Sequence, residues 1–452
     1  MGDLKHIISA LVLQKKYLSA KEIMSEQNAA DLSVMFEELF GDDFEEKKEF
    51  LLLFRLLPKD LAADTFAFMN PQMQMHLISA FSDDELREML AKTCIDDTVD
   101  IIEEMPANVV SRILQNSTMG ARKAINEILR YPSDSAGSIM TIEYVSFHKD
   151  MTVLEAFDKI RMVGVNKETI YTCYVTENRR LIGIVTVKDL FLAEEDDKIG
   201  DIMQTNIISV DTLEDTEVVA NMFQKYDFLA IPVTDREERL VGIVTFDDAM
   251  DVIQEENTED VTLMAAIVPN DDSYFRTGVL KHARSRLPWL LFLMISATVT
   301  GIITTKYETA FEALPILVSF MPMIMGTGGN CGSQSSTMII RGIALEEIEF
   351  KDFFKVVFKE FRIAILVSIM LALVNGVRIF FMYDNNIALA VTISLSIVAT
   401  VIISKLIGAM LPMVAKKCRL DPAIMAAPLI TTIVDSCSIL LYFTIAMKIF
   451  NI

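Results

Sequence analysis

One acidic residue, Asp435, stands inside an apolar stretch, Ala423–Phe450, that is long enough to cross a membrane. A bilayer is spanned by about 20 apolar residues in a helix. A carboxylate at that depth is costly to bury and is therefore a functional-site hypothesis by default. Thr431 lies one helical turn from Asp435 and places a hydroxyl on the same face. Asp435 and Thr431 are therefore candidates for a polar path inside the membrane.

A second apolar stretch carries four glycines within seven residues, between Gly326 and Gly332. Glycine is a poor helix former, and in a bilayer freed backbone groups are tolerated only where they line protein or water. We therefore expect this segment to line a pore, with Gly328, Asn330 and Gln334 as candidate residues. Close helix packing through small residues is an alternative that can hold at the same time.

A third polar feature is the acidic segment Asp247–Asp260. On a helix, four of its carboxylates fall within about 80° of one another, and Met250, Ile253, Val261 and Met264 fall on the opposite side. The four carboxylates belong to Asp248, Asp251, Glu255 and Glu259. Such a stripe is either a solvated face or one that meets another acidic face across a divalent cation.

The net charge of −22 is unevenly spread over the 452 residues. Residues 1–270 hold 25 Lys and Arg against 51 Asp and Glu, a net of −26, whereas residues 271–452 hold 16 against 12, a net of +4. This balance disfavours nucleic acid as a partner and favours cations.

The apolar back half predicts an all-α bundle of five membrane spans, because the runs are too long and too numerous for a soluble core. The predicted spans are Leu287–Thr305, Leu314–Ile340, Ile363–Met382, Ala388–Val414 and Ala423–Phe450. Lys and Arg gather before span one, between spans two and three, and between spans four and five. Positive loops face the cytoplasm, so we expect the acidic half in the cytosol and the C-terminus outside.

The acidic half contains a helical region and an internal repeat. Residues 1–130 show apolar spacings of three and four throughout, which indicates short helices in series. Leu181–Asp189 matches Leu240–Asp248, 59 residues later, and each unit is expected to run strand, helix, strand, turn, strand, helix. This repeat resembles a tandem pair of CBS domains over residues 138–255.

The CBS resemblance implies adenine-nucleotide binding in the first unit. The residues that match are Tyr171, Thr186, Lys188 and Asp189. In that family the threonine and aspartate hold the ribose, and Tyr171 is placed to stack on a base. The alternative is that Thr186 and Asp189 only cap the helix that follows them.

At a larger scale the sequence resembles the MgtE family of magnesium channels over nearly its whole length. The specific pieces are Pro322–Gln334, Asp421-Pro422 with Pro428 and Asp435, and Tyr131–Gly137. The resemblance implies a superhelical N-domain (1–130), a tandem CBS pair of α+β type (131–246), an acidic linker helix (247–284) and a transmembrane domain (285–452). Ala427 departs from the family pattern, in which a polar residue precedes the span-five proline.

The resemblance also implies what the chain does. A homodimer in the plasma membrane would conduct Mg²⁺ along its axis between spans two and five, with Asp435 selecting the ion. Mg²⁺ would be both substrate and regulator, closing the gate through acidic cytosolic faces, and ATP could modulate it. The implied regulatory ligands are Asp96, Asp100, Asp215, Asp227, Asp248, Asp251, Glu255, Glu256, Glu259 and Asp260.

Other functions remain open at this stage. One is a CBS-regulated transporter of another divalent cation or a solute. For an anion, Arg378 and Lys405 are the positive candidates within spans, and both are expected near span ends. Another is a membrane-tethered nucleotide sensor without transport. The five cysteines show no CxxC spacing, which predicts neither a disulfide framework nor a zinc knuckle, and no catalytic pair indicates an enzyme.

Overall fold

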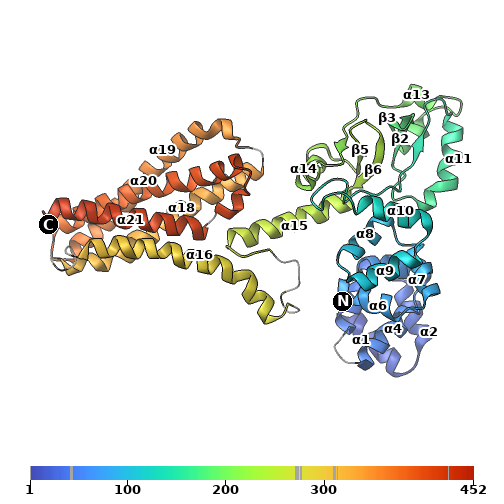
Figure 1. Ribbon diagram of the computed structural model, residues 1–452, viewed down its shortest axis with the longest axis horizontal. Helices are drawn as coiled ribbons and strands as arrows, with labels where there is room; N and C mark the ends of the chain where they lie inside the picture. Colours follow the sequence, from blue (N-terminus) through green and yellow to red (C-terminus); the bar gives the residue numbers. More distant parts are fainter. Residues whose placement is uncertain are drawn as a thin grey trace. The chain divides into compact units, whose positions relative to one another are not determined.

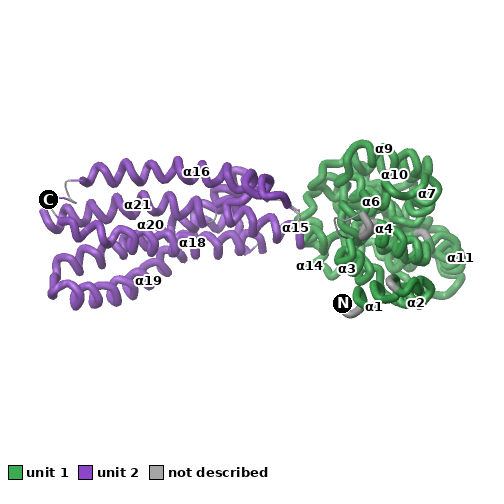
Figure 2. The backbone as a smooth tube through the Cα atoms, turned by 90° about the horizontal axis from the view of Figure 1, so that it is seen from below, with its two compact units in different colours: residues 1–253 green, residues 254–452 purple. Residues whose placement is uncertain are grey.

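The computed structural model describes residues 2–40, 44–269, 274, 277–308, 312, 314–345, 347–425 and 427–451. The chain divides into two compact units, residues 1–253 and residues 254–452 (Figure 2). Each unit has its own hydrophobic core.

The first unit begins with short helices stacked in series (Figure 1). Their bounds are α1 Gly2–Leu13, α2 Tyr17–Ser25, α3 Ala29–Leu39, α4 Phe44–Phe54, α5 Lys59–Ala67, α6 Pro71–Ala80, α7 Asp83–Leu90, α8 Ile95–Glu103, α9 Ala107–Asn116 and α10 Met119–Ile128. Side-chain caps set several starts; Ser82 and Glu85 form a reciprocal capping box at α7. Fully buried aromatic rings, among them Phe36, Phe50 and Phe66, fill the core. The all-helical character predicted for residues 1–130 is confirmed.

Two small sheets follow, one for each half of the internal repeat. The first half contains β1 Ser146–Phe147, α11 Val153–Val163, η1 Gly164–Asn166, β2 Thr172–Glu177, β3 Arg180–Thr186 and α12 Val187–Leu192. The second contains α13 Ile199–Ile202, β4 Val210–Asp211, α14 Thr216–Tyr226, β5 Ala230–Thr234, β6 Leu240–Thr245 and α15 Phe246–Met264. In both sheets the first strand pairs in parallel with the second, and the second pairs antiparallel with the third. The predicted order of strands and helices is confirmed.

Each half of the repeat contributes one methionine whose side chain packs against a strand of the other half. Met203, which precedes the second sheet, packs on Gly183 of β3, where a Cβ would lie 2.5 Å from the Met203 sulfur. Met140, which precedes the first sheet, packs in the same way on Gly242 of β6, at 2.6 Å. Only glycine leaves room for these close approaches, so the repeated glycine and the repeated Ile-Met motif act together to join the two halves.

The acidic helix α15 is the last helix of the second half of the repeat and ends at Met264, well before residue 284, where the predicted linker ended. Its buried residues are Ala249 and Val252, whereas Met250 and Val261 are exposed. Met250 and Val261, on the side opposite the predicted carboxylate stripe, are therefore not part of the buried side of α15. The helix buries small and β-branched residues next to Asp248 because this part of α15 packs on the core of residues 1–253.

The second unit is a bundle of long helices. Its elements are α16 Val279–Lys306, η2 Pro315–Phe320, α18 Met321–Ala344, η3 Phe350–Asp352, α19 Phe353–Met382, α20 Ile387–Lys417, η4 Pro422–Met425 and α21 Ala427–Phe450. Among the described residues, four helical segments are long and apolar enough to cross a membrane: Val279–Lys306, Phe350–Met382, Ile387–Lys417 and Pro422–Phe450. The glycine-rich α18, 24 residues long, is not one of the four, so the predicted count of five spans is not confirmed.

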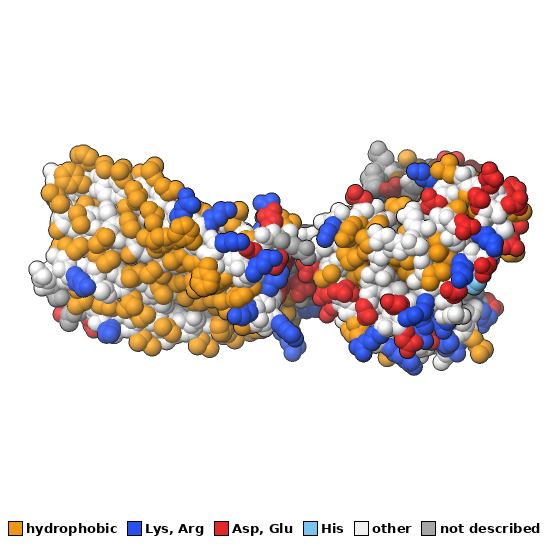
Figure 3. All heavy atoms as spheres, turned by 90° about the horizontal axis from the view of Figure 1, so that it is seen from above, with side chains coloured by type: hydrophobic (Ala, Val, Ile, Leu, Met, Phe, Trp, Pro, Cys, Tyr) orange, Lys and Arg blue, Asp and Glu red, His pale blue; other side chains and the backbone are white. Residues whose placement is uncertain are grey.

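Apolar side chains cover much of this bundle's surface (Figure 3). Leu366, Met370 and Phe381 of α19 are exposed, and α16 has no buried residue along its whole length. A water-soluble unit rarely exposes large contiguous apolar patches, whereas lipid-facing helices do. This surface therefore suits a bilayer.

Candidate functional site

The glycines of α18 bring this helix close to α20 and α21. A Cβ at Gly328 would lie 2.7 Å from a methyl carbon of Thr400 and 2.8 Å from the Ser438 hydroxyl. A Cβ at Gly332 would lie 2.8 Å from a methyl carbon of Ile430. These approaches are closer than side chains tolerate, so the glycines serve helix packing. The predicted pore residue Gly328 is buried at this contact.

The opposite side of α18 carries a polar stripe. Gly326, Asn330 and Gln334 recur every four residues and are all exposed in the single chain, so they lie on one face of the helix. An amide side chain facing hydrocarbon leaves its donors and acceptors unpaired, at a cost of several kcal/mol. This stripe therefore requires water or another protein surface in front of it.

Asp435 lies on α21, one helical turn after Thr431. Thr431, one turn earlier, meets α18 where a Cβ on Gly329 would approach its methyl group to 2.9 Å. The hydroxyl of Thr431 donates to the Pro428 carbonyl at 2.9 Å, which leaves its lone pairs available to a cation or to water. Asp435 itself is half-buried. The structure thus places Asp435 and Thr431 on the helix that adjoins the one carrying Asn330 and Gln334.

A buried charged network in the same bundle was missed at the sequence level. Glu360 of α19 and Lys405 of α20 are both buried, and Ser335 of α18 lies between them. The Ser335 hydroxyl donates to a Glu360 carboxylate oxygen at 2.7 Å, and the Lys405 ammonium donates to the Ser335 oxygen at 3.1 Å. Glu360 was outside the predicted span, which began at Ile363, whereas α19 begins at Phe353.

The position of Lys405 corrects one expectation. It lies 12 residues before the end of α20, about 18 Å along the axis, and not near a span end. Its charge is neutralised by Glu360 and so does not form an open anion path. Arg378 lies four residues before the end of α19, as expected, and is exposed.

In the first unit, acidic residues from different elements lie close enough to repel one another. Burial, followed by the nearby Asp248 and Glu168 carboxylates, raises the pKa of Asp96 to about 9. Burial raises the pKa of Asp248 to about 7, and Asp247 and Asp100 add to the rise, against hydrogen bonds from Thr245. Asp96 and Asp100 on α8 thus face Asp248 on α15, which brings three of the predicted regulatory residues together. A divalent cation relieves this kind of repulsion.

The other predicted regulatory residues are spread out. Asp215 caps the N-terminus of α14, and Asp227 lies at its C-terminus in a left-handed conformation, about 18 Å apart along the helix. Asp251 lies on α15, where burial and then Asp247 raise the pKa of its carboxyl. The remaining four lie on the part of α15 that belongs to the second unit: Glu255, Glu256, Glu259 and Asp260.

The predicted nucleotide residues gather at the start of α12. Thr186 and Asp189 form a reciprocal capping box, with the Thr186 hydroxyl donating to the Asp189 carboxylate at 2.7 Å. The Val187 amide donates to the Tyr171 carbonyl at 3.0 Å, and the Tyr171 ring is 67% exposed. Lys188 is exposed beside them. Thr186 and Asp189 therefore do cap α12. The exposed Tyr171 ring and Lys188 ammonium group are accessible to a ligand.

Comparison with known proteins bears on all of these regions. Residues 321–445 match a family described as a divalent cation transporter, residues 27–134 match the MgtE intracellular N domain, and residues 136–196 and 199–255 match CBS domains. The chain is 32% identical to the magnesium transporter MgtE of Thermus thermophilus, over 94% of each chain. It is 33% identical to the magnesium transporter MgtE of Bacillus subtilis, over 97% of this chain and 96% of that one. The chain belongs to the MgtE family of magnesium transporters.

Solved structures agree with the MgtE assignment. The cytosolic domain of an Mg²⁺ channel MgtE, crystallised with ATP, covers 53% of this chain and 97% of its own length, with a TM-score of 0.50 and 33% identity. The soluble part of a magnesium transporter covers 57% and 99%, with a TM-score of 0.51 and 28% identity. As an MgtE protein the chain is a membrane protein with CBS domains, and the resemblance inferred from its motifs is confirmed.

Proposed function

We propose that two copies of this chain form an Mg²⁺-selective channel in the cell membrane, with Asp435 of each copy at the ion path. The observation that carries the proposal is the exposed polar stripe of α18, Gly326, Asn330 and Gln334, on the helix that adjoins the Asp435 helix. In a bilayer this stripe requires water or protein in front of it. A second copy that faces the first across a hydrated path supplies both.

The chemistry of the path suits a hydrated magnesium ion. Mg²⁺ prefers six oxygen ligands and loses its water reluctantly. Two Asp435 carboxylates, with the Thr431 and Asn330 oxygens nearby, hold such an ion through its water shell. Binding of this kind is loose enough to let the ion leave again.

A flux measurement tests the path. Purified protein in liposomes that contain a fluorescent Mg²⁺ indicator should admit Mg²⁺, whereas the Asp435→Asn protein should lose nearly all flux while still assembling as a dimer. Asp384→Asn, which alters an exposed loop carboxylate, is the matched control and should keep native flux. Native flux through Asp435→Asn would refute the assignment, and preferential flux of another divalent ion would refute the Mg²⁺ selectivity.

We further propose that cytosolic Mg²⁺ closes this channel by binding between acidic faces. Asp96 and Asp100 on α8 and Asp248 on α15 repel one another without a cation. The other predicted carboxylates on α14 and α15 add to the charge that has to be neutralised. Because a ligand shifts an equilibrium only by its differential affinity for the two states, several weak sites act together in closing the gate.

Limited proteolysis with and without Mg²⁺ tests the gating proposal. Mg²⁺ should protect residues 1–264 of the native chain, and Asp248→Asn combined with Asp100→Asn should weaken that protection. Channel currents should fall as internal Mg²⁺ rises, and removal of residues 1–260 should abolish the dependence. Protection and currents that both ignore Mg²⁺ would contradict gating without contradicting conduction.

ATP is proposed as a modulator that binds at Tyr171, Thr186, Lys188 and Asp189. The exposed ring and ammonium beside the α12 cap support this.

We also propose the membrane orientation that the positive loops predict, with the acidic half in the cytosol and the C-terminus outside.

A further inference from the structure

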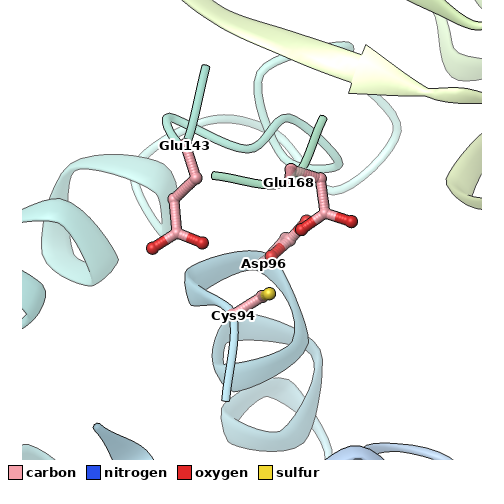
Figure 4. Close-up of side chains that lie close together, drawn as sticks. All are labelled: Cys94, Asp96, Glu143 and Glu168. Carbon is pink, nitrogen blue, oxygen red and sulfur yellow. The ribbon is translucent and has the colours of Figure 1, made fainter. Parts of the chain in front are cut away.

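Four side chains that none of the roles above uses as a set meet at the start of α8 (Figure 4). The sulfur of Cys94 and one carboxylate oxygen from each of Asp96, Glu143 and Glu168 all lie within 4.8 Å of one another. Cys94 and Asp96 belong to the helical region, whereas Glu143 and Glu168 belong to the first CBS half, before β1 and after η1 respectively. The cluster therefore joins two regions within the first unit.

The backbone holds these four residues in place. The Glu168 amide donates to the Glu143 carbonyl at 2.9 Å, which ties the two glutamates together. Cys94 is the N-cap residue of α8, and its carbonyl accepts from the Thr98 hydroxyl at 2.8 Å. The backbone that carries the four side chains is therefore held by hydrogen bonds. Their sulfur and oxygen atoms need little rearrangement to bind one common ion.

Asp96 is the residue whose bonding is incomplete. Its side chain is only 8% exposed, and its Oδ1 atom is buried without a hydrogen-bond partner among the residues that the structure describes. A buried carboxylate oxygen without a partner is costly. Figure 4 shows the Asp96 and Glu168 carboxyl groups next to each other, close to the Cys94 sulfur. What is missing at this position is a cation or a proton.

The charge balance points the same way. Three carboxyl groups and a thiol meet here, with Asp96 buried and the other three side chains partly buried. The positive end of the α8 dipole favours anionic ligands at Cys94 and Asp96 but does not neutralise three carboxylates and a thiolate. A divalent cation does so, and the ligands release their protons when it binds.

We propose that Cys94, Asp96, Glu143 and Glu168 form a binding site for a thiophilic divalent metal ion of the Zn²⁺ type. Mg²⁺ takes oxygen ligands, whereas a thiolate selects softer ions. Zn²⁺ accepts sulfur at about 2.3 Å and carboxylate oxygen at about 2.0–2.2 Å, so tetrahedral ligand atoms lie about 3.5 Å apart. The four groups need to close by only about 1 Å to reach that geometry. The metal would fasten the helical region to the first CBS half.

Cadmium binding to the full-length protein in detergent tests this proposal, because Cd²⁺ bound to a thiolate absorbs in the ultraviolet. One Cd²⁺ per chain should produce this band in excess Mg²⁺, and Zn²⁺ should displace it. Cys94→Ser should remove the band, and Glu168→Gln should weaken Cd²⁺ binding by about tenfold or more. Cys418→Ser, which changes an exposed free cysteine, is the matched control and should keep the band.

Two outcomes would overturn the site: no thiolate band in the native protein, or an unchanged band in Cys94→Ser. Glu168→Gln leaves the thiol in place, so full affinity in that variant would overturn the four-ligand set even if Cys94→Ser failed to fold. Mg²⁺ flux of the same samples separates this result from the proposed channel function. Because Cys94 takes no part in the ion path, Cys94→Ser should conduct Mg²⁺ normally.

Discussion

The Lys405 ammonium nitrogen lies 3.9 Å from a Glu360 carboxylate oxygen inside the helical bundle, with the Ser335 hydroxyl bridging the two. Three helices, α18, α19 and α20, each contribute one member of this network. Because a charge inside a membrane is tolerated only when it is paired or hydrated, the pair constrains how these helices pack.

Removal of one partner should therefore destabilise the bundle. Glu360→Gln leaves the Lys405 charge buried and uncompensated, which typically costs about 3–5 kcal/mol. The melting temperature in detergent should fall clearly. Glu360→Gln combined with Lys405→Met should recover most of the loss, because no buried charge remains. Lys355→Ala, which removes an exposed ammonium group from its pair with Asp352 at the N-cap of α19, should change little; a loss as large as that of Glu360→Gln would show that burial is not the cause.

Replacement by alanine should have very different effects on stability at two glycines of the bundle. A Cβ on Gly408 would lie 2.2 Å from the Gly332 carbonyl oxygen, so α18 and α20 would have to separate. Overpacking of this kind costs about 1–3 kcal/mol or more, and Gly408→Ala should lower both melting temperature and yield of folded protein. Gly301→Ala on α16, where a Cβ meets nothing within 4 Å, should be neutral. Equal stability of the two variants would contradict the helix contact.

The stability of the metal-free first unit, residues 1–253, should fall as pH rises. The pKa values of Asp96 and Asp248 are raised from 3.8 to about 9 and about 7, so the folded state holds more protons than the unfolded state between about pH 4 and 9. The free energy of unfolding then decreases with rising pH in that window. Thermal melts in a metal chelator should show this decrease, and Mg²⁺ should stabilise the protein more at about pH 9 than at about pH 6.

Asp96→Asn is the informative variant for this pH dependence. It should flatten the decrease in stability, since it removes the group with the most strongly raised pKa. Glu22→Gln, at an exposed position on α2, should leave the slope unchanged. If the stability of Asp96→Asn still fell with pH as steeply as that of the native protein, other titratable groups would be responsible for the pH dependence.

Nucleotide binding should depend on an exposed ring. Tyr171→Ala removes a side chain that is 67% exposed, so it should not affect folding, yet it should weaken ATP binding by about tenfold or more through lost stacking. Calorimetry on the full-length protein measures this. Phe191→Ala on α12, also an exposed aromatic residue, should bind ATP normally. No ATP binding to the native chain would refute this part of the proposal and leave ion conduction untouched.

Local patterns in the sequence were sufficient for much of this protein. The internal repeat predicted two equivalent strand and helix orders, because strand and helix periodicity are properties of neighbouring residues. The charge difference between the two halves and the length of the apolar runs indicated a membrane protein with an acidic part outside the apolar runs. The mid-span Asp435 and the glycines of α18 were recognisable because acids and clustered glycines are costly in a membrane helix.

Other features were decided only by tertiary contacts. Gly328 and Asn330 are two residues apart, yet Gly328 packs against α20 and α21 whereas Asn330 is exposed. Only the positions of the neighbouring helices determine which side of α18 is buried. Glu360 and Lys405 are 45 residues apart, and Cys94 and Glu168 are 74 apart, so no local pattern joins them. Burial, ion pairing and raised pKa values arise where segments that are distant in the sequence come into contact. No short stretch of sequence determines those contacts.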